Sequence, residues 1–288
     1  MTDEHFSTDA LVLVGHGSTI NQQSSEPVRL LANELAGRNI FATVSTAFNL
    51  EEPKIDHVPL IDAERIFVVP ITISEGHFTE ETIPFRLGLC KKGECDCPEG
   101  VCNYPRTEER DGKHLIYCHP VGTHPNMTEI LLSRARGVVS EYPFPKAPKP
   151  AEIALFIAGH GTNKNKKSRE AIEAQVDLIR ARDEYADVRS AFMEEAPFIA
   201  DCYSVAGSKH IVMVPFFIAD GLHTVEDIPV LLGEPEARVK ERHGAGQPTW
   251  HNPTERNGKL IWYSRAIGNE PKLPDVVLEL VREMTDKH

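Results

Sequence analysis

The chain has 288 residues, of which 41% are hydrophobic and 26% charged, and its 43 acidic and 31 basic residues give a net charge of −12. This globular composition has the length of two domains, and no stretch has the roughly 18 consecutive apolar residues that a membrane span needs. A negative field of this size repels nucleic acid and anionic lipid, so we expect neither as a partner. The N-terminal residues carry acids where a signal peptide carries bases, which predicts a cytoplasmic protein.

Strands and helices alternate along the first half of the chain. Apolar runs predict strands at residues 10–14, 41–47, 66–73 and 114–118. Helical patterns predict helices that end near Gly37, cover 53–63, run from Gly76 toward Leu89 and cover 125–139. Alternation of this kind predicts parallel strands joined by right-handed crossovers, and therefore an α/β domain.

A proline-rich stretch separates this half from a second one. Residues 143–150 contain four prolines and predict a stiff linker. The pattern then restarts, with strands at 152–158, 188–192, from 211 and at 258–263, and with helices at 168–181, 197–203 and 274–284. We therefore expect domains at 1–142 and 151–288.

The two halves repeat each other in sequence. Residues 66–84 read IFVVPITISEGHFTEETIP, and residues 211–229 read IVMVPFFIADGLHTVEDIP. Elsewhere the offset stays between 144 residues, from His16 to His160, and 146 residues, from Gly122 to Gly268. Such a repeat indicates internal duplication. The duplicated chain supplies both halves of a pseudo-dimer, so we expect a monomer.

Each half carries two histidines at the predicted carboxyl edge of its sheet. His16 and His160 follow the first strand within a Gly-His-Gly turn, and His77 and His223 follow the third strand. Ligands of open α/β sheets bind at this edge, and imidazole suits Co, Ni, Fe and Zn. A tight turn in which the histidine caps the next helix is the alternative, but the repeated pairs favour a metal site.

The two later turns differ by one residue. Without gaps, His223 aligns with Phe78, whereas His77 aligns with Leu222. A shift of one residue redirects a side chain, so His160 and His223 form the stronger candidate pair.

These motifs, Gly-His-Gly-Ser/Thr after the first strand and Val-Pro…Gly-X-His-X-X-X-Asp-Ile-Pro after the third, resemble the class II chelatases of the CbiX-like family. The resemblance implies two chelatase-like α/β domains facing each other across an active cleft. It also implies a lyase that inserts a divalent metal into sirohydrochlorin during cobalamin or sirohaem synthesis. Co²⁺ is the favoured metal, and Fe²⁺ and Ni²⁺ are alternatives. By motif, His160 and His223 match the metal-binding and catalytic pair, with His16 and His77 as first-half counterparts, although His77 departs from the family spacing.

Charged residues near the histidines suit this chemistry. Metal insertion removes two pyrrole N–H protons, and a proton relay is expected among the nearby acids Glu75, Glu80, Asp220, Glu226 and Asp227. The alternative is that these acids only stabilise helix N-termini. Cations after the second Gly-His-Gly turn can bind the carboxylates of the tetrapyrrole, or can form a solvated loop; they are Lys164, Lys166, Lys167 and Arg169.

Four cysteines cluster in a first-half insert at residues 90–102, with no counterpart in the second half: Cys90, Cys95, Cys97 and Cys102. Four thiolates in a reducing compartment fit a [4Fe–4S] cluster, which we favour, or a structural zinc ion. A non-catalytic metal or tetrapyrrole carrier built around this cluster is the alternative from another functional class.

Overall fold

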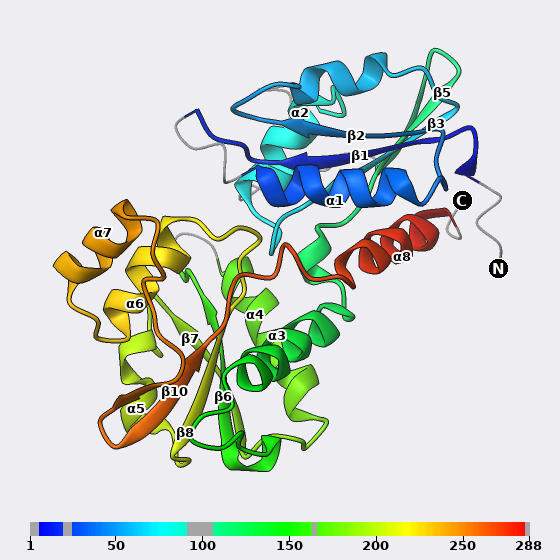
Figure 1. Cartoon of the computed structure of the whole chain (residues 1–288). Helices are drawn as coiled ribbons and strands as arrows, with labels where there is room; N and C mark the ends of the chain where they lie inside the picture. The colour runs from blue at the N-terminus through cyan, green and yellow to red at the C-terminus, as the bar shows by residue number, and fades with distance from the viewer. Residues whose placement is uncertain (1–5, 20–24, 91–105, 163–165, 286–288) are drawn as a thin grey trace. The chain divides into compact units, whose positions relative to one another are not determined.

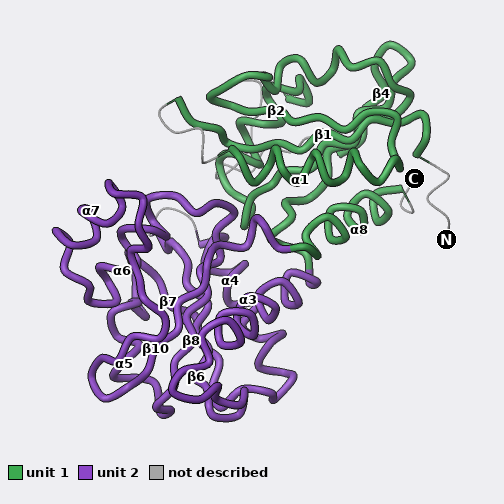
Figure 2. Tube along the Cα trace, in the orientation of Figure 1, with its two compact units in different colours: residues 1–124, 271–288 green, residues 125–270 purple. Residues whose placement is uncertain are grey.

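The computed structural model describes residues 6–19, 25–90, 106–162 and 166–285, which form two compact units. Unit 1 comprises residues 1–124 and 271–288, and unit 2 comprises residues 125–270 (Figure 2). No helix in these ranges is both long and apolar enough to cross a membrane.

Unit 1 is built on a five-stranded sheet with the order β2-β1-β3-β5-β4 (Figure 1). Four strands are parallel, and β4 pairs antiparallel with β5 at one edge. The strands are β1 (Ala10–Gly15), β2 (Thr43–Phe48), β3 (Arg65–Pro70), β4 (Thr107–Arg110) and β5 (Lys113–Tyr117). β1 is apolar throughout and completely buried, as an interior strand of a sheet covered on both faces should be.

Unit 2 repeats this sheet with the order β7-β6-β8-β10-β9. Its strands are β6 (Ile153–Gly159), β7 (Asp187–Phe192), β8 (His210–Pro215), β9 (Thr254–Arg256) and β10 (Lys259–Tyr263). The same order and the same antiparallel edge in both units confirm the predicted duplication of an α/β domain.

Helices and helical turns connect the strands. In the first half they are α1 (Glu26–Gly37), a 3₁₀ turn (Ile55–Leu60), a π-helical turn (Phe78–Thr82) continued by α2 (Ile83–Arg86), a 3₁₀ turn (Val121–Thr123) and α3 (Met127–Glu141). In the second half they are a 3₁₀ turn (Pro150–Glu152), α4 (Lys167–Arg180), a 3₁₀ turn (Ile199–Asp201) with α5 (Cys202–Val205), a π-helical turn (His223–Asp227) with α6 (Ile228–Leu231), α7 (Glu236–Gly244) and α8 (Leu273–Thr285).

The last helix of each half belongs to the other half's unit. Helix α3 precedes the proline-rich stretch but packs against β8, β10 and α4 of unit 2, and α8 packs against β3 and α1 of unit 1. The compact units therefore divide at residues 124–125 and 270–271, not at the expected linker 143–150. The linker is held within unit 2, because the indole N–H of Trp262 donates to the carbonyl of Tyr142 at 2.8 Å.

The antiparallel edge hairpins and α7 were not predicted. The hairpin turns are Asp111-Gly112 and Asn257-Gly258, in which all four residues have positive φ. Asp-Gly and Asn-Gly pairs are the strongest short-range signal for such turns, so the sequence contained this information. Helix α7 follows α6 in unit 2 and lines a cavity beside His223.

Candidate functional site

The Gly-His-Gly turn of unit 2 places His160 directly after β6. Gly161 has a φ of +69°, and a Cβ atom on it would lie 2.8 Å from the Cγ of Glu195. A Cβ on Gly159 would lie 1.9 Å from Ile172 of α4. Both positions therefore require glycine, and the tight turn exposes the imidazole of His160 at the carboxyl edge of the sheet.

His223 opens the π-helical turn after β8. Turns of this kind are rare and occur most often at functional sites. The turn that begins at His223 is anchored to the sheet, because the hydroxyl of Tyr263 on β10 donates to the carbonyl of Thr224 at 2.7 Å. Tyr263 is buried, and burial raises the pKa of its hydroxyl well above the ordinary value, so it remains a proton donor.

The two imidazoles of unit 2 face each other. Their ring centroids lie 4.8 Å apart at an interplanar angle of 82°, and the side chains of His160 and His223 are 36% and 50% exposed. Nδ1 of His160 lies 2.8 Å from the carbonyl oxygen of Gly161, and Nδ1 of His223 lies 2.7 Å from a carboxylate oxygen of Asp227. A carbonyl or carboxylate oxygen only accepts, so each Nδ1 carries the proton and each Nε2 keeps its lone pair for a metal ion.

Glu194 is a site residue that the sequence reasoning missed. Its Oε1 lies 3.7 Å from Nε2 of His160, and it also lines the cavity beside His223. The signal was present in the repeat, since the gapless offset of 144 residues places Glu194 opposite Leu50. A carboxylate that replaces an exposed apolar residue in only one half indicates a function specific to that half.

In unit 1, the side chains around the Gly-His-Gly histidine differ from those in unit 2. His16 faces the ring of Phe78 at 5.0 Å, so an apolar ring occupies the position of His223. His77 is 78% exposed and pairs with Glu81 at 3.1 Å. Phe78 and not His77 is thus the neighbour of His16, and the one-residue shift seen in the sequence persists in the structure.

The acids proposed as a proton relay separate into different environments. Asp227 bonds to His223, whereas Glu226 pairs with His243 of α7. Asp220 accepts the amide of Ala266 at 2.8 Å. In unit 1, Glu75 lies 3.5 Å from His119, and Glu80 belongs to the π-helical turn.

Of the cations proposed to bind substrate, Arg169 forms ion pairs and a ring contact within the protein. Its guanidinium pairs with Glu173 at 2.8 Å and Glu195 at 3.0 Å, and it lies 5.0 Å above the ring of Phe192. Lys166 is exposed and Lys167 is half-buried, while Lys164 lies outside the described residues. Among Lys166, Lys167 and Arg169, only Lys166 is exposed to solvent.

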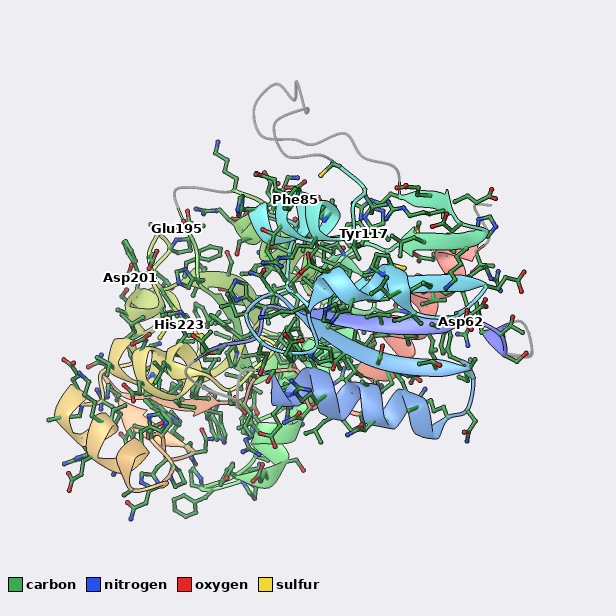
Figure 3. All side chains as sticks on the ribbon, turned by 90° about the horizontal axis from the view of Figure 1, so that it is seen from above. Asp62, Phe85, Tyr117, Glu195, Asp201 and His223 are labelled. Carbon is green, nitrogen blue, oxygen red and sulfur yellow. The ribbon has the colours of Figure 1, made fainter. Side chains whose placement is uncertain are left out.

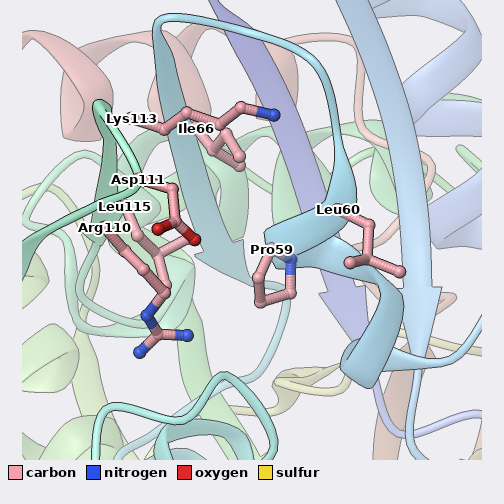
Figure 4. Close-up of a pocket in the computed structure, with 7 residues that line it drawn as sticks. All are labelled: Pro59, Leu60, Ile66, Arg110, Asp111, Lys113 and Leu115. Atoms are coloured by element: carbon pink, nitrogen blue, oxygen red, sulfur yellow. The ribbon is translucent and has the colours of Figure 1, made fainter.

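A cavity of 460 Å³ adjoins His223. Its walls come from the end of β7, the π-helical turn, α6 and α7, and include Glu194, Asp227 and Lys240. A second cavity of 240 Å³ lies in unit 1 between the 3₁₀ turn at Leu60 and the β4–β5 hairpin turn at Asp111 (Figure 4). It contacts Ile66 and Lys113, at the starts of β3 and β5, so it lies at the sheet edge opposite to the histidines.

The cysteine insert falls largely outside the described residues, since only Cys90 of the four lies within them, where it is half-buried. Within residues 6–19, 25–90, 106–162 and 166–285 there is no group of three or more His, Cys, Asp or Glu side chains arranged to hold a metal ion. Within the described part of unit 2, two imidazoles therefore come together without a third such side chain arranged to complete a metal site.

The chain is similar to known proteins in both of its halves. The CbiX family model matches residues 10–138 and again residues 154–284. A probable sirohydrochlorin cobaltochelatase of Halobacterium salinarum is 37% identical over 274 residues, which cover 94% of this chain and 89% of that protein. The sirohydrochlorin cobaltochelatase of Methanopyrus kandleri is 28% identical over 139 residues, 46% of this chain but 96% of its own length.

Solved structures show the same fold. A multi-domain protein of Deinococcus radiodurans, described as similar to chelatases, superposes with a TM-score of 0.71 at 25% identity over 95% of this chain; the chain spans 54% of that protein. A CbiX described as the terminal enzyme of siroheme biosynthesis in denitrifying bacteria superposes with a TM-score of 0.62 at 20% identity, covering 96% of this chain and 98% of its own. Because the family model matches both halves of the chain, the protein belongs to the CbiX family, whose fold it contains twice.

Proposed function

We propose that this protein inserts a divalent metal ion, Co²⁺ in the first place, into sirohydrochlorin at the His160–His223 pair of unit 2. The facing imidazoles, each with a free Nε2 lone pair, are the observation that carries the proposal. Relatives named sirohydrochlorin cobaltochelatases, one of which aligns with 94% of the chain, support the substrate and the metal.

The chemistry follows from these side chains. The two Nε2 atoms bind the metal substrate and replace part of its water shell. Asp227 holds His223 in the required tautomer and ring orientation. The carboxylate of Glu194, beside His160, is placed to accept a pyrrole proton as the metal enters the macrocycle. Asp227 is one of the five acids expected from the sequence to form a relay, and Glu194 is proposed in addition to them.

Single substitutions test the assignment. His160→Ala and His223→Ala each remove one of two imidazole ligands, and we expect metal insertion to fall at least about 100-fold, because a ligand loss exceeds the effect of losing its outer-shell partner. The measurement is the absorption change of sirohydrochlorin with Co²⁺, Fe²⁺ and Ni²⁺ in turn, which also identifies the preferred metal. His16→Ala is the matched control in the other half and should retain activity within about threefold, since its position lacks a second imidazole. Full activity in both unit 2 variants would overturn the assignment, and absence of turnover with every metal would favour a carrier.

We also propose that Cys90, Cys95, Cys97 and Cys102 bind a [4Fe–4S] cluster. Four thiols within thirteen residues support this, and the proposal rests on the sequence. Protein purified without oxygen should be brown, with broad absorption and four iron atoms per chain by elemental analysis. Stoichiometric zinc would show that the centre is structural.

The cellular location and the oligomeric state of the protein are also proposed. We propose a cytoplasmic monomer. The monomeric state is supported by the two matches to the family model within one chain, whereas the relative of Methanopyrus kandleri aligns with 46% of this chain over 96% of its own length. Light scattering of the full chain gives its mass directly.

A further inference from the structure

One peptide group of the Gly-His-Gly turn is held from both sides. The carbonyl of Gly161 accepts the Nδ1 proton of His160 at 2.8 Å. The N–H of the same peptide group, on Thr162, donates to Oε1 of Glu195 at 3.2 Å. The orientation of this peptide therefore links the carboxylate of Glu195 to the imidazole of His160.

Glu195 is itself fixed at the end of β7. Its side chain is only 14% exposed, and Oε2 pairs with the guanidinium of Arg169 at 3.0 Å (Glu195 is labelled in Figure 3). Arg169 also donates to the carbonyl of Ala196 at 3.0 Å and covers the ring of Phe192. This carboxylate is thus a rigid acceptor that is held beside a cation.

Unit 1 provides an internal comparison. Glu51 is the counterpart of Glu195, and its Cγ likewise lies 2.9 Å from a Cβ placed on Gly17. Its Oε1 is buried without a hydrogen-bond partner among the described residues, and its arginine, Arg29, lies 3.6 Å away. There the Nδ1 of His16 is 3.3 Å from the carbonyl of Gly17, against 2.8 Å in unit 2. The hydrogen bond between carboxylate and peptide in unit 2 thus occurs together with the shorter distance between peptide and imidazole.

We propose that Glu195 is a positioning residue for His160, acting through the Gly161–Thr162 peptide, with Arg169 holding Glu195 in place. A carboxylate on the N–H polarises the peptide and strengthens its carbonyl as an acceptor. The carbonyl then holds the Nδ1–H tautomer and leaves the lone pair of Nε2 for the metal. This inference rests on the proposed role of His160 as a metal ligand.

The test combines two measurements on the full chain. Nitrogen NMR of ¹⁵N-histidine-labelled, metal-free protein reports which ring nitrogen of His160 carries the proton, and His160→Ala assigns the signals. Titration with Co²⁺ alone gives its Kd. For Glu195→Ala we expect a mixed tautomer and a Kd raised about 10-fold or more, as for loss of other outer-shell partners. Glu195→Gln keeps an acceptor for Thr162, so it should restore the tautomer and bring the Kd to within about threefold of the native value.

Glu51→Ala is the matched control, and it should leave both the His160 signals and the Kd unchanged. A folded Glu195→Ala protein with the native tautomer and a Kd within about twofold of the native one would refute the inference. If Glu195→Ala does not fold, Arg169→Met takes its place, with the same two readouts and the same criterion. Sirohydrochlorin turnover by the native protein is measured in parallel; its absence would count against the proposed function, while the tautomer result would still decide the role of Glu195.

Discussion

Two positions distinguish the surroundings of the Gly-His-Gly histidine in the two halves. Where unit 2 has His223 and Glu194, unit 1 has Phe78 and Leu50, although the surrounding turns and strands are the same. An imidazole and a carboxylate have thus been replaced by apolar side chains, or the reverse, without a change of fold. The same fold thus accommodates either pair of side chains, and only the pair in unit 2 gives its Gly-His-Gly histidine a facing imidazole and a carboxylate.

Restoring these two side chains should create a second site. In the double variant Leu50→Glu with Phe78→His, we expect one Co²⁺ ion more per chain than in the native protein, because His16 gains a facing imidazole and a carboxylate. Equilibrium dialysis with cobalt analysis measures the stoichiometry. The matched double variant Leu50→Ala with Phe78→Ala should add no ion, and equal stoichiometry in both doubles would contradict the prediction.

Cys118 and Cys202, which lie outside the cysteine insert, should not react with alkylating agents in the folded protein. Burial raises the pKa of the Cys118 and Cys202 thiols to about 12, because the interior disfavours the thiolate. A raised pKa keeps both groups protonated from neutral pH up to about pH 11, so the reactive thiolate is almost absent. Mass spectrometry after iodoacetamide at pH 8.5 should find both unmodified in native protein and alkylated after unfolding; native alkylation would show that these sites open.

At the scale of elements, the π-helical turn decides where the second histidine points. In both units the tyrosine at the end of the fourth parallel strand supports this turn: Tyr117 donates to the carbonyl of Thr79 at 2.6 Å, and Tyr263 donates to that of Thr224 at 2.7 Å. The support is therefore common to the fold, whereas the histidine it positions is present in unit 2 alone.

Removing either hydroxyl should affect stability equally but metal binding unequally. Tyr117→Phe and Tyr263→Phe each leave a buried carbonyl without its donor, which costs about 1–3 kcal/mol of unfolding free energy. We expect only Tyr263→Phe to raise the Kd for Co²⁺, since only its turn carries a metal-binding histidine. Denaturant unfolding and cobalt titration measure the two effects, and equal Co²⁺ affinity in both variants would argue against the role of the turn.

At the scale of the whole molecule, the exchange of α3 and α8 determines what folds together. Helix α3 buries Ile130, Leu131 and Leu132 completely within unit 2, and α8 completes unit 1, where Arg38 pairs with Asp275 at 2.5 Å. An amphipathic helix is stabilised by the sheet it covers more than by its own propensity. The proline-rich stretch therefore lies inside a compact unit.

Fragments distinguish the two divisions of the chain. Residues 125–270 contain a sheet with its covering helix, so we expect this fragment to unfold cooperatively in denaturant. Residues 151–288 lack α3 and carry α8 without its sheet, so they should expose apolar surface and bind a hydrophobic dye. Circular dichroism and dye fluorescence make the comparison, and a stable 151–288 fragment would contradict the exchange.

The amino-acid sequence by itself determined the duplicated α/β fold, the positions of the parallel strands and the four histidines, because apolar periodicity, glycine turns and the 144-residue repeat are local signals. It also showed the one-residue shift at His77. Only the tertiary structure decided that Glu194 lies beside His160 and that Arg169 forms an ion pair with Glu195. It also decided that α3 packs in unit 2 and α8 in unit 1. These features depend on contacts between residues distant in the chain, where the geometry of packing, and not any local pattern, selects the partner.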